Sequence, residues 1–546
     1  MRITELLVYL LILVISIVFL QWSFRVLKWA RMLLYHLRST QNIPGPESKP
    51  FIGSWHLLKD GGADEFTFFL LREAKKASAT SGVMKLWTGP ILRLYIFDPE
   101  IMRVVTNSTT EIKKAFDYDR FHQWFGNGLV TSHGDYWRKS RKMLTPAFHF
   151  TKLEEYANVM NVHARKLVKH LNTKADGEVH NIYTAIQLTA LDNICGLYSI
   201  DFYEDCWISE TAMGIQMNAM KNPEQPYIKA VKSFLSLSFL QLTNPMYFFS
   251  WYWKWLGYEE KDRQSIKVLK HMSTEVIQKR IAAREAEGND LQSRPDFLDM
   301  LLNAYQDGQM SFKEIREQVD TFLFAGSDTL STGTSWVLWC LACHQDVQER
   351  LYTEIKDAFD DDTEFAPNKL KELPYLDAVV KETLRMFPSL GMIGRELQND
   401  VQIGEQKLPA GSTVNLGIYL MHHNEKIFPD SWKFDPERFL DDRTPSPGAY
   451  MPFSAGPRNC LGQRFANNQL RIFVAHLLYN FRFSADMKFL DNRPRLANPF
   501  CSDKRSSCAN GKTSTLNSFV FVVCCYHLTT SNFICFLNKR QTDHLS

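Results

Sequence analysis

The sequence predicts a mainly α-helical protein with small β-sheets, an α+β fold, that follows one transmembrane helix. Three observations support this prediction. A run of 19 uncharged residues, Leu6–Phe24, lies near the amino terminus. Long segments with apolar residues at helical spacing follow it. One of the ten cysteines, Cys460, stands in the stretch FSAGPRNCLG, directly before such a segment.

The apolar run Leu6–Phe24 is long enough to cross a hydrocarbon core of about 30 Å as a helix. The basic residues Arg25, Lys28, Arg31 and Arg38 follow it, so the positive-inside rule places the rest of the chain in the cytosol. A cleaved signal peptide is the alternative, but the run is long and no small-residue cleavage site follows it. We therefore expect a single-pass anchor.

The chain divides into four expected parts. Residues 1–24 form the transmembrane anchor, and residues 25–53 form a basic stop-transfer segment and a proline-rich hinge, because proline fixes φ and ends helices. Residues 54–496 form one globular domain without repeats or low-complexity linkers, and residues 497–546 form an atypical tail. The tail is rich in Ser, Asn and Cys, and we expect much of it to be poorly ordered.

Helical periodicity and short apolar runs locate the main elements of the domain. Long amphipathic segments lie near residues 151–171, 262–286, 313–343 and 461–480, and strand-like runs lie at 83–86, 92–97 and 414–416. The aromatic stretch MYFFSWYWKWLGY, Met246 to Tyr258, is interpreted as core packing in preference to a surface that dips into a membrane.

The composition argues against two classes of protein, nucleic-acid-binding proteins and proteins held by a disulfide framework. The net charge of +3 over 546 residues gives no support for nucleic-acid binding. The ten cysteines are scattered singly through most of the chain, which is typical of a reduced compartment and not of a disulfide framework.

The surroundings of Cys460 indicate a metal ligand. The periodic segment that begins at Leu461 predicts a helix start at the cysteine, where free amides and the helix dipole favour a thiolate. Gly456 and Gly462 permit backbone shapes or close approaches that a Cβ would block. Arg458 is placed to reach a carboxylate at the edge of a flat cofactor. A lone cysteine is usually a small core residue, but core packing does not require these neighbours.

The pattern FxxGxRxCxG, which begins at Phe453, resembles the cytochrome P-450 family of haem-thiolate monooxygenases. The resemblance implies a haem between a long central helix and the cysteine loop. It further implies a haem b whose iron takes an axial thiolate from Cys460, and electrons from NADPH through NADPH–cytochrome P-450 reductase, with cytochrome b5 as a further partner. It also implies a location in the endoplasmic reticulum membrane with the haem-thiolate domain, 54–496, in the cytosol.

The stretch TFLFAGSDTL lies in the long helical segment 313–343 and matches the family's acid–alcohol motif. Thr329 is expected to turn its hydroxyl to the carbonyl of Ala325, which would loosen the helix, and Asp328 is expected to relay protons. Ala325 and Gly326 are expected to leave room beside the backbone. Many relatives in the ω-hydroxylase branch carry at the position of Ala325 a glutamate that becomes esterified to the haem, so we expect non-covalent haem here.

Glu382 and Arg385 in KETLR are three residues apart, and Arg438 in DPERF completes the family's Glu-Arg-Arg network. We interpret the three as structural, the alternative being a solvated surface pair. Cys340 and Cys343 form a CxxC pair that continues the long helix and is interpreted as core.

The haem propionates have four expected partners, Trp137, Arg141, Arg395 and Arg458, the last two implied by the family resemblance. Trp137 and Arg141 share a helix face in YWRKSRK. The opposite face carries lysines that are either a docking face for an acidic electron donor or merely solvated.

The match to the family covers residues 1 to about 485 and is closest to the animal fatty-acid ω-hydroxylase branch. It implies a fatty acid, related lipid, hormone or xenobiotic as substrate. Pocket-lining positions are expected in 118–129, 205–255, 322–329 and 387–394. Two alternatives remain: a haem-thiolate isomerase or dehydratase, and a haem-binding protein made inactive by its tail.

Overall fold

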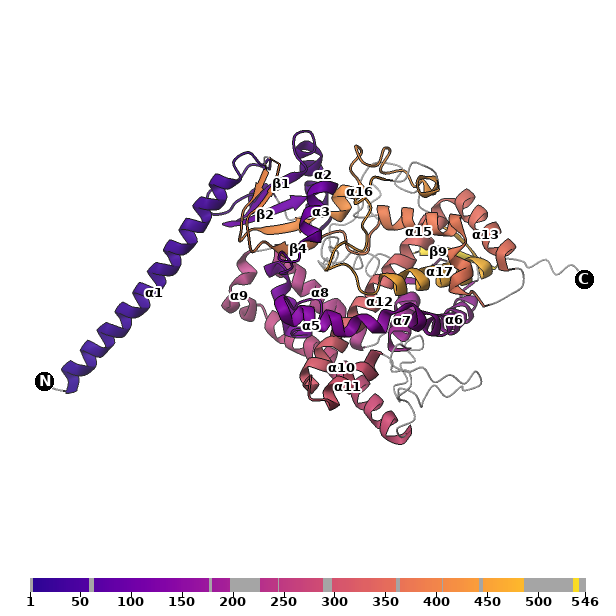
Figure 1. The fold of residues 1–546 in the computed structure, drawn as a ribbon, viewed down its shortest axis with the longest axis horizontal. Coiled ribbons are helices and arrows are strands. Elements are labelled where there is room, and N and C mark those ends of the chain that lie inside the picture. Colours follow the sequence, from indigo (N-terminus) through magenta and orange to yellow (C-terminus); the bar gives the residue numbers. More distant parts are fainter. Residues whose placement is uncertain are drawn as a thin grey trace, which may run out of the picture.

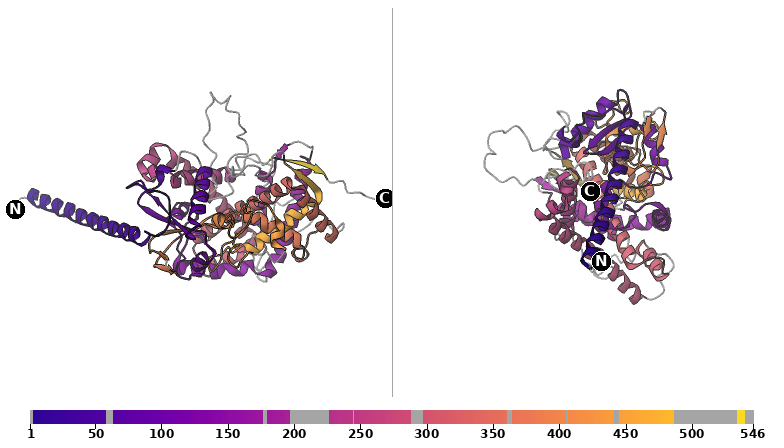
Figure 2. Two further views of the ribbon diagram at one scale, coloured as in Figure 1. Left: turned by 90° about the horizontal axis from the view of Figure 1, so that it is seen from above. Right: turned by 90° about the vertical axis from the view of Figure 1, so that its left-hand side faces the viewer.

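The computed structural model describes residues 3–57, 63–175, 179–196, 226–243, 245–287, 297–359, 364–404, 406–440, 445–485 and 534–539. Helices make up most of this body, and three small sheets lie among them (Figures 1 and 2). The predicted class, mainly α with small sheets, is confirmed.

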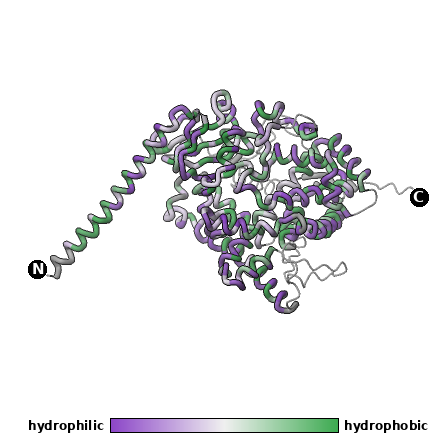
Figure 3. Tube along the Cα trace, viewed as in Figure 1, coloured by the Kyte–Doolittle hydropathy of each residue, from purple (hydrophilic) through white to green (hydrophobic). Residues whose placement is uncertain are grey.

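The first helix, α1 (Ile3–Ser39), projects away from the body and is apolar along most of its length (Figures 1 and 3). The helix over residues 9–39 is long and apolar enough to cross a membrane; its most apolar 18-residue window has a mean hydropathy of 2.2, and none of that window is buried. The helix continues past the expected anchor boundary at residue 24. At its end Tyr35 donates to Asp400 at 2.6 Å and His36 pairs with the carbonyl of Ala410 at 2.9 Å, which attaches it to the body.

The remaining helices form the body. They are α2 (Ala63–Ala77), α3 (Pro99–Asn107), α4 (His122–Phe125), α5 (Gly134–Leu144), α6 (Phe150–Asn172), α7 (Tyr183–Gly196), α8 (Pro226–Thr243), α9 (Ser250–Trp255), α10 (Tyr258–Glu287), α11 (Phe297–Gln306), α12 (Phe312–Cys343), α13 (Gln345–Phe359), α14 (Pro367–Lys371), α15 (Pro374–Met386), α16 (Ile418–His422) and α17 (Gln463–Asn480). The four long segments predicted from periodicity correspond to α6, α10, α12 and α17, and all four are confirmed.

The largest sheet has the strand order β1 (Val83–Thr88), β2 (Ile91–Ile96), β7 (Thr413–Leu416), β4 (Ile393–Glu396). β2 and β7 run parallel, and the other neighbours run antiparallel. Its apolar side chains form one of two cores, and the helices around α12 form the other. The three predicted strands are therefore confirmed, and β4 places the segment after α15 beside the site.

Two smaller sheets complete the fold. β5 (Val401–Ile403) pairs with β6 (Gln406–Leu408). β9 (Ile534–Lys539) lies between β3 (Val179–Asn181) and β8 (Phe481–Ser484) and pairs antiparallel with both. β9 belongs to the tail, so these six tail residues lie in a sheet, which does not test the expectation that much of the tail is poorly ordered. The other tail residues lie outside the described ranges.

The central helix α12 is 32 residues long and begins with a capping box, in which Ser311 and Glu314 bond each other's backbone amides. It packs against α7, α10, α15 and α17, and most of its side chains are buried. Its middle turns are therefore held in a fixed position in the interior.

The aromatic stretch around α9 is mostly exposed, so its interpretation as core is wrong. Trp251 is 63% exposed and Trp255 75%, whereas Trp253 is 7% exposed. The reason is helical geometry: residues four apart share a face, and the residue between them points the other way. Met246, Phe249, Trp251 and Trp255 form an exposed group that we call the aromatic surface. In Figure 1, α9 lies at the end of the body from which α1 emerges.

Candidate active site

A cavity of about 390 Å³ lies between the middle of α12 and the loop that carries Cys460. Most of its wall is apolar, with aromatic rings from several elements (Phe121, Phe125, Phe148, Phe239, Phe322, Phe324, Phe453). Three of the four expected pocket segments, 118–129, 322–329 and 387–394, contribute several lining residues. From 205–255 Phe239 lines the cavity, and residues 205–225 lie outside the described ranges.

The cysteine loop is held by its own backbone. The Cys460 amide donates to the carbonyl of Phe453 at 3.0 Å, and the amide of Asn459 to the carbonyl of Gly456 at 3.0 Å. Gly456 has φ = +70°, and a Cβ there would lie 2.1 Å from the backbone oxygen of Thr106. The expectation that this position requires glycine is confirmed by both facts.

Gly462 shows a different reason for glycine. Among the described residues, a Cβ on Gly462 would come near one atom, Cε1 of Phe148 at 3.9 Å, because Gly462 borders the cavity. The protein itself would tolerate a side chain here. The bare backbone instead leaves open space beside Cys460 at the cavity.

The Cys460 side chain is exposed to the cavity although protein surrounds it. Burial raises the pKa of its thiol, and the amide of Gly462 and the guanidinium of Arg141 oppose that rise without cancelling it. The Gly462 amide thus acts in the predicted direction, and burial is the larger effect on the thiol. α17 begins at Gln463, so Cys460 stands two residues before the N-cap, Gly462.

On the opposite wall, Thr329 donates its hydroxyl to the carbonyl of Ala325 at 2.6 Å, which confirms the predicted bond. The helix is α-helical throughout, so the expected loosening does not occur. Asp328 is buried at the cavity and accepts a hydrogen bond of 3.4 Å from Gln187 on α7. Ala325, Asp328 and Thr329 all line the cavity.

Gly326 also lines the cavity, but its missing side chain leaves no open room. A Cβ there would lie 2.1 Å from Cδ1 of Ile194 on α7. Ile194 itself lines the cavity. Glycine at this position therefore allows α7 to approach α12 closely, and the expected gap is filled by an isoleucine.

A group of cations lies at one side of the cavity without a carboxylate partner. Within the described ranges no acidic side chain lies within ion-pair distance of Lys114, Arg141, Arg395 or Arg458, which instead bond backbone carbonyls, an amide oxygen or aromatic rings. Burial lowers the pKa of Arg458 to about 9, with Arg395 adding to the effect.

The same cause acts on the neighbours of Arg458. Burial lowers the pKa of Arg395 to about 10 and that of Lys114 well below its usual value, and the positive charges of Arg458 and Arg395 depress Lys114 further. Such mutual repulsion is relieved when an anion binds. The carboxylates of a haem fit this requirement.

Of the predicted propionate partners, three line the cavity and the fourth does not. Trp137, Arg141 and Arg458 line the cavity, whereas Arg395 is 2% exposed and donates to the carbonyls of Val105 and Glu111. Lys114, which lines the cavity with its Nζ 4.5 Å from the Tyr118 ring, was missed. In the sequence it is one of two adjacent lysines, a pattern that looks like ordinary surface.

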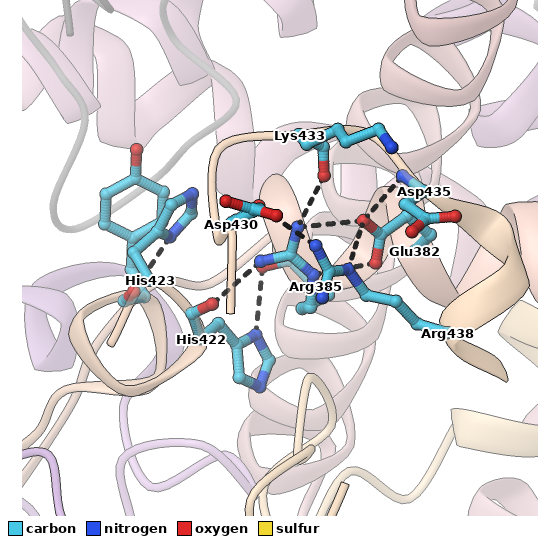
Figure 4. A network of polar contacts seen from close by, with 9 residues as sticks. Glu382, Arg385, His422, His423, Asp430, Lys433, Asp435 and Arg438 are labelled. Atoms are coloured by element: carbon cyan, nitrogen blue, oxygen red, sulfur yellow. Dashed lines mark hydrogen bonds and ion pairs between the residues drawn. The ribbon is translucent and has the colours of Figure 1, made fainter. Parts of the chain in front are cut away.

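The three residues interpreted as structural, Glu382, Arg385 and Arg438, form one buried network (Figure 4). Arg385 donates to both carboxylate oxygens of Glu382, at 2.7 and 2.9 Å, and to the carbonyl of His422 at 2.8 Å. Arg438 lies 3.5 Å from Glu382. The Glu382 and Arg385 side chains have no exposed surface, so the alternative of a solvated pair is wrong.

Cys340 and Cys343 lie in α12, and burial raises the pKa of Cys340 well above its usual value and that of Cys343 to about 12. The interpretation as core is confirmed for Cys340, which is buried, whereas Cys343 is only half-buried. Among the described residues, no three His, Cys, Asp or Glu side chains group as a metal site.

Comparisons with known proteins agree with this geometry. A family model described as cytochrome P450 matches residues 43–499. The chain is 34% identical to cytochrome P450 4c3 of Drosophila melanogaster over 472 residues, 82% of this chain and 84% of that protein. It is 34% identical to cytochrome P450 4V2 of Homo sapiens over 463 residues, 80% of this chain and 83% of that protein.

Proposed function

Since this chain belongs to the cytochrome P450 family of haem-thiolate monooxygenases, we propose that it uses Cys460 as the iron ligand to oxidise a lipophilic substrate. The observation that supports this most is that Cys460 and the pair Asp328–Thr329 line one cavity from opposite elements. A substrate in that cavity would lie between an iron ligand and a source of protons.

The residues that would hold the haem follow from the wall. Cys460 would bind the iron, and a coordinating metal deprotonates a thiol outright, which would offset the cost of burial. Trp137, Arg141 and Arg458, with Lys114, would pair with the propionates, and Arg395 would add positive charge behind them. When bound, the haem iron supplies the activation of dioxygen that no side chain can perform.

Four further residues would form the surface against the haem faces. Phe453, Gly462, Ala325 and Gly326 border the cavity and present a ring or small groups. Gly456 would not contact the haem itself; it would allow the cysteine loop to pass close to the backbone of Thr106. Ala325 has no nucleophilic oxygen, so the haem would be held without a covalent bond from this position.

Proton delivery is the proposed role of Asp328 and Thr329. Reduction of one oxygen atom to water consumes two protons, which must reach a largely apolar cavity in order. Asp328 is an ionisable group at the wall, and the Thr329 hydroxyl is oriented by its bond to the Ala325 carbonyl. This acid–alcohol pair favours the monooxygenase over an isomerase or dehydratase, which needs no such protons.

We expect Thr329→Ala to keep its haem but to divert electrons from product to hydrogen peroxide, lowering product per NADPH by about tenfold or more. Asp328→Asn should lower kcat more than it changes ligand affinity. Product and peroxide are measured per NADPH consumed. Ser327→Ala is the matched control, because Ser327 makes the same bond to the Leu323 carbonyl, at 2.6 Å, but does not line the cavity. Wild-type yields in both site variants would favour the isomerase.

We also expect acidified organic solvent to remove the haem completely in unmodified form, because Ala325 cannot form an ester. Reversed-phase chromatography of denatured protein after turnover measures this. Ala325→Glu is the informative comparison, since its carboxylate would give partial covalent attachment. Haem that stays with the denatured wild-type chain would contradict the placement of Ala325 at the haem edge.

The substrate and partners are proposed from the cavity wall and surface. The aromatic wall fits a fatty acid, related lipid, hormone or xenobiotic, and ω-hydroxylation is the proposed reaction on a fatty acid. Electrons would come from NADPH through NADPH–cytochrome P-450 reductase, with cytochrome b5 as a further donor. Lys139 and Lys142 are exposed on the outer face of α5 and suit an acidic donor.

We propose a single-pass location in the endoplasmic reticulum membrane, with the body in the cytosol. The apolar helix α1 supports an anchor, and the aromatic surface near its end of the body would give a second lipid contact.

The alternative of an inactive haem protein rests on the tail, since the family match ends at residue 499. β9 argues against that alternative, because it fills the middle of the sheet beside β8.

A further inference from the structure

A buried arginine outside the proposed haem site connects several elements around the cavity. Arg120, 8% exposed, lies in the 3-10 helix Phe116–Phe121 just before α4. Its Nη2 donates to Asp262 on α10 at 2.5 Å. Its Nε donates to Ser238 at 2.7 Å and its Nη1 to Gln241 at 2.9 Å, both on α8. All three nitrogens of the side chain are thus engaged by other elements.

Aromatic rings enclose the same guanidinium. It lies 5.3 Å from the ring centre of Phe234 on α8 and 5.1 Å from that of Trp253 on α9. The indole of Trp253 donates to the second oxygen of Asp262 at 3.1 Å. Arg120 and Asp262 are therefore a buried ion pair whose remaining polar atoms are also bonded, the geometry in which breaking one contact disturbs the others.

This cluster stands directly behind the cavity wall. Phe121 follows Arg120 in the chain, and Phe239 follows Ser238, and both rings line the cavity. The centre of the Phe121 ring lies 5.6 Å from that of Phe125, which also lines the cavity, and 5.6 Å from that of Phe234. Arg120 thus connects the segment that carries Phe121 to the helix that carries Phe239.

We propose that Arg120 is a positioning residue that sets the spacing of the aromatic walls and thereby decides which lengths of lipophilic ligand the cavity accepts. The inference rests on the proposed function for its ligand class. Differences of one methylene in an apolar pocket change discrimination by about tenfold or more, so a small shift of either wall is enough to alter selectivity. Arg120 itself does not line the cavity.

The test compares Arg120→Lys with a matched control in the purified full-length haem protein. Lysine keeps the charge and the pair with Asp262, but its three N–H groups sit on a single nitrogen and cannot span the acceptors that Arg120 reaches from three separate nitrogens. Arg280→Lys makes the same change in another buried pair, where Arg280 donates to Asp299 at 3.0 and 2.8 Å between α10 and α11, away from the cavity wall.

The probes are 1-alkylimidazoles from methyl to dodecyl, whose second ring nitrogen binds haem iron and shifts its absorption. The readout is the ratio of the affinities of the longest and shortest probes, which does not depend on turnover. We expect Arg120→Lys to change this ratio by about fivefold or more, the effect of one lost hydrogen bond, and Arg280→Lys to leave it at the wild-type value.

An unchanged ratio in Arg120→Lys, or an equal change in both variants, would overturn the proposal, because the pair would then act on stability alone. If Arg120→Lys fails to retain haem, Ser238→Ala, which removes one acceptor and keeps the ion pair, is judged by the same criterion. Wild-type protein that binds no haem would instead contradict the proposed function.

Discussion

Replacing Glu382 with alanine should abolish recovery of folded haem protein, the largest stability effect we expect from a single change. Arg385 would keep its charge in a place with no exposed surface and would lose both carboxylate bonds. Removing one partner of a buried ion pair costs about 3–5 kcal/mol. Whole domains are stable by only about 5–15 kcal/mol. Thermal unfolding and haem content of the purified protein measure the effect.

Glu260→Ala is the control for this change. Glu260 pairs with Arg263 at the same i, i+3 spacing on α10, but both side chains are exposed to solvent. We expect no measurable loss of haem or stability in the control. A Glu382→Ala protein as stable as the control would show that the network in Figure 4 does not hold the fold behind the cysteine loop.

Replacing Cys460 with histidine should remove the thiolate from the iron and leave a haem protein with nitrogen ligation, or none. Cys460 is the described cysteine whose side chain is exposed to the cavity, whereas Cys340 and Cys195 are buried elsewhere. Electron paramagnetic resonance of the ferric protein distinguishes sulfur from nitrogen ligands. Cys340→Ala and Cys343→Ala should keep the wild-type signal. A wild-type signal in Cys460→His would contradict the assignment.

Much of the fold could be predicted because its elements are long and regular. α6, α10, α12 and α17 each repeat apolar residues over several turns, so the helical period is well determined by the sequence. β9 gave no such signal. Its place between β3 and β8 is set by pairing with distant strands, of which β3 lies hundreds of residues earlier, and such long-range contacts leave no local pattern.

The site could be predicted where a motif fixes a local bond. The Thr329–Ala325 contact follows from the four-residue spacing alone. The surroundings of Gly326 and Lys114 could not be predicted, because Ile194 and Tyr118 come from other segments of the chain. The raised pKa of Cys460 was also missed, since desolvation depends on everything that surrounds the thiol.

The exposed aromatic surface shows a third limit. An aromatic stretch in sequence indicates apolar side chains but not what covers them. Trp251 and Trp255 share one face of the short helix α9, and that face points outward. The spacing of the tryptophans would have shown that they cannot all be buried, although it would not have shown which face is exposed.

The most direct test of a haem-thiolate enzyme is the absorption spectrum of the reduced, carbon-monoxide-bound wild-type chain, purified with its anchor and tail. Thiolate ligation from Cys460 predicts the strongly red-shifted Soret band that only a sulfur-ligated haem gives under carbon monoxide. A Soret band at the position of histidine-ligated haem, or no haem in well-folded protein, would contradict the account.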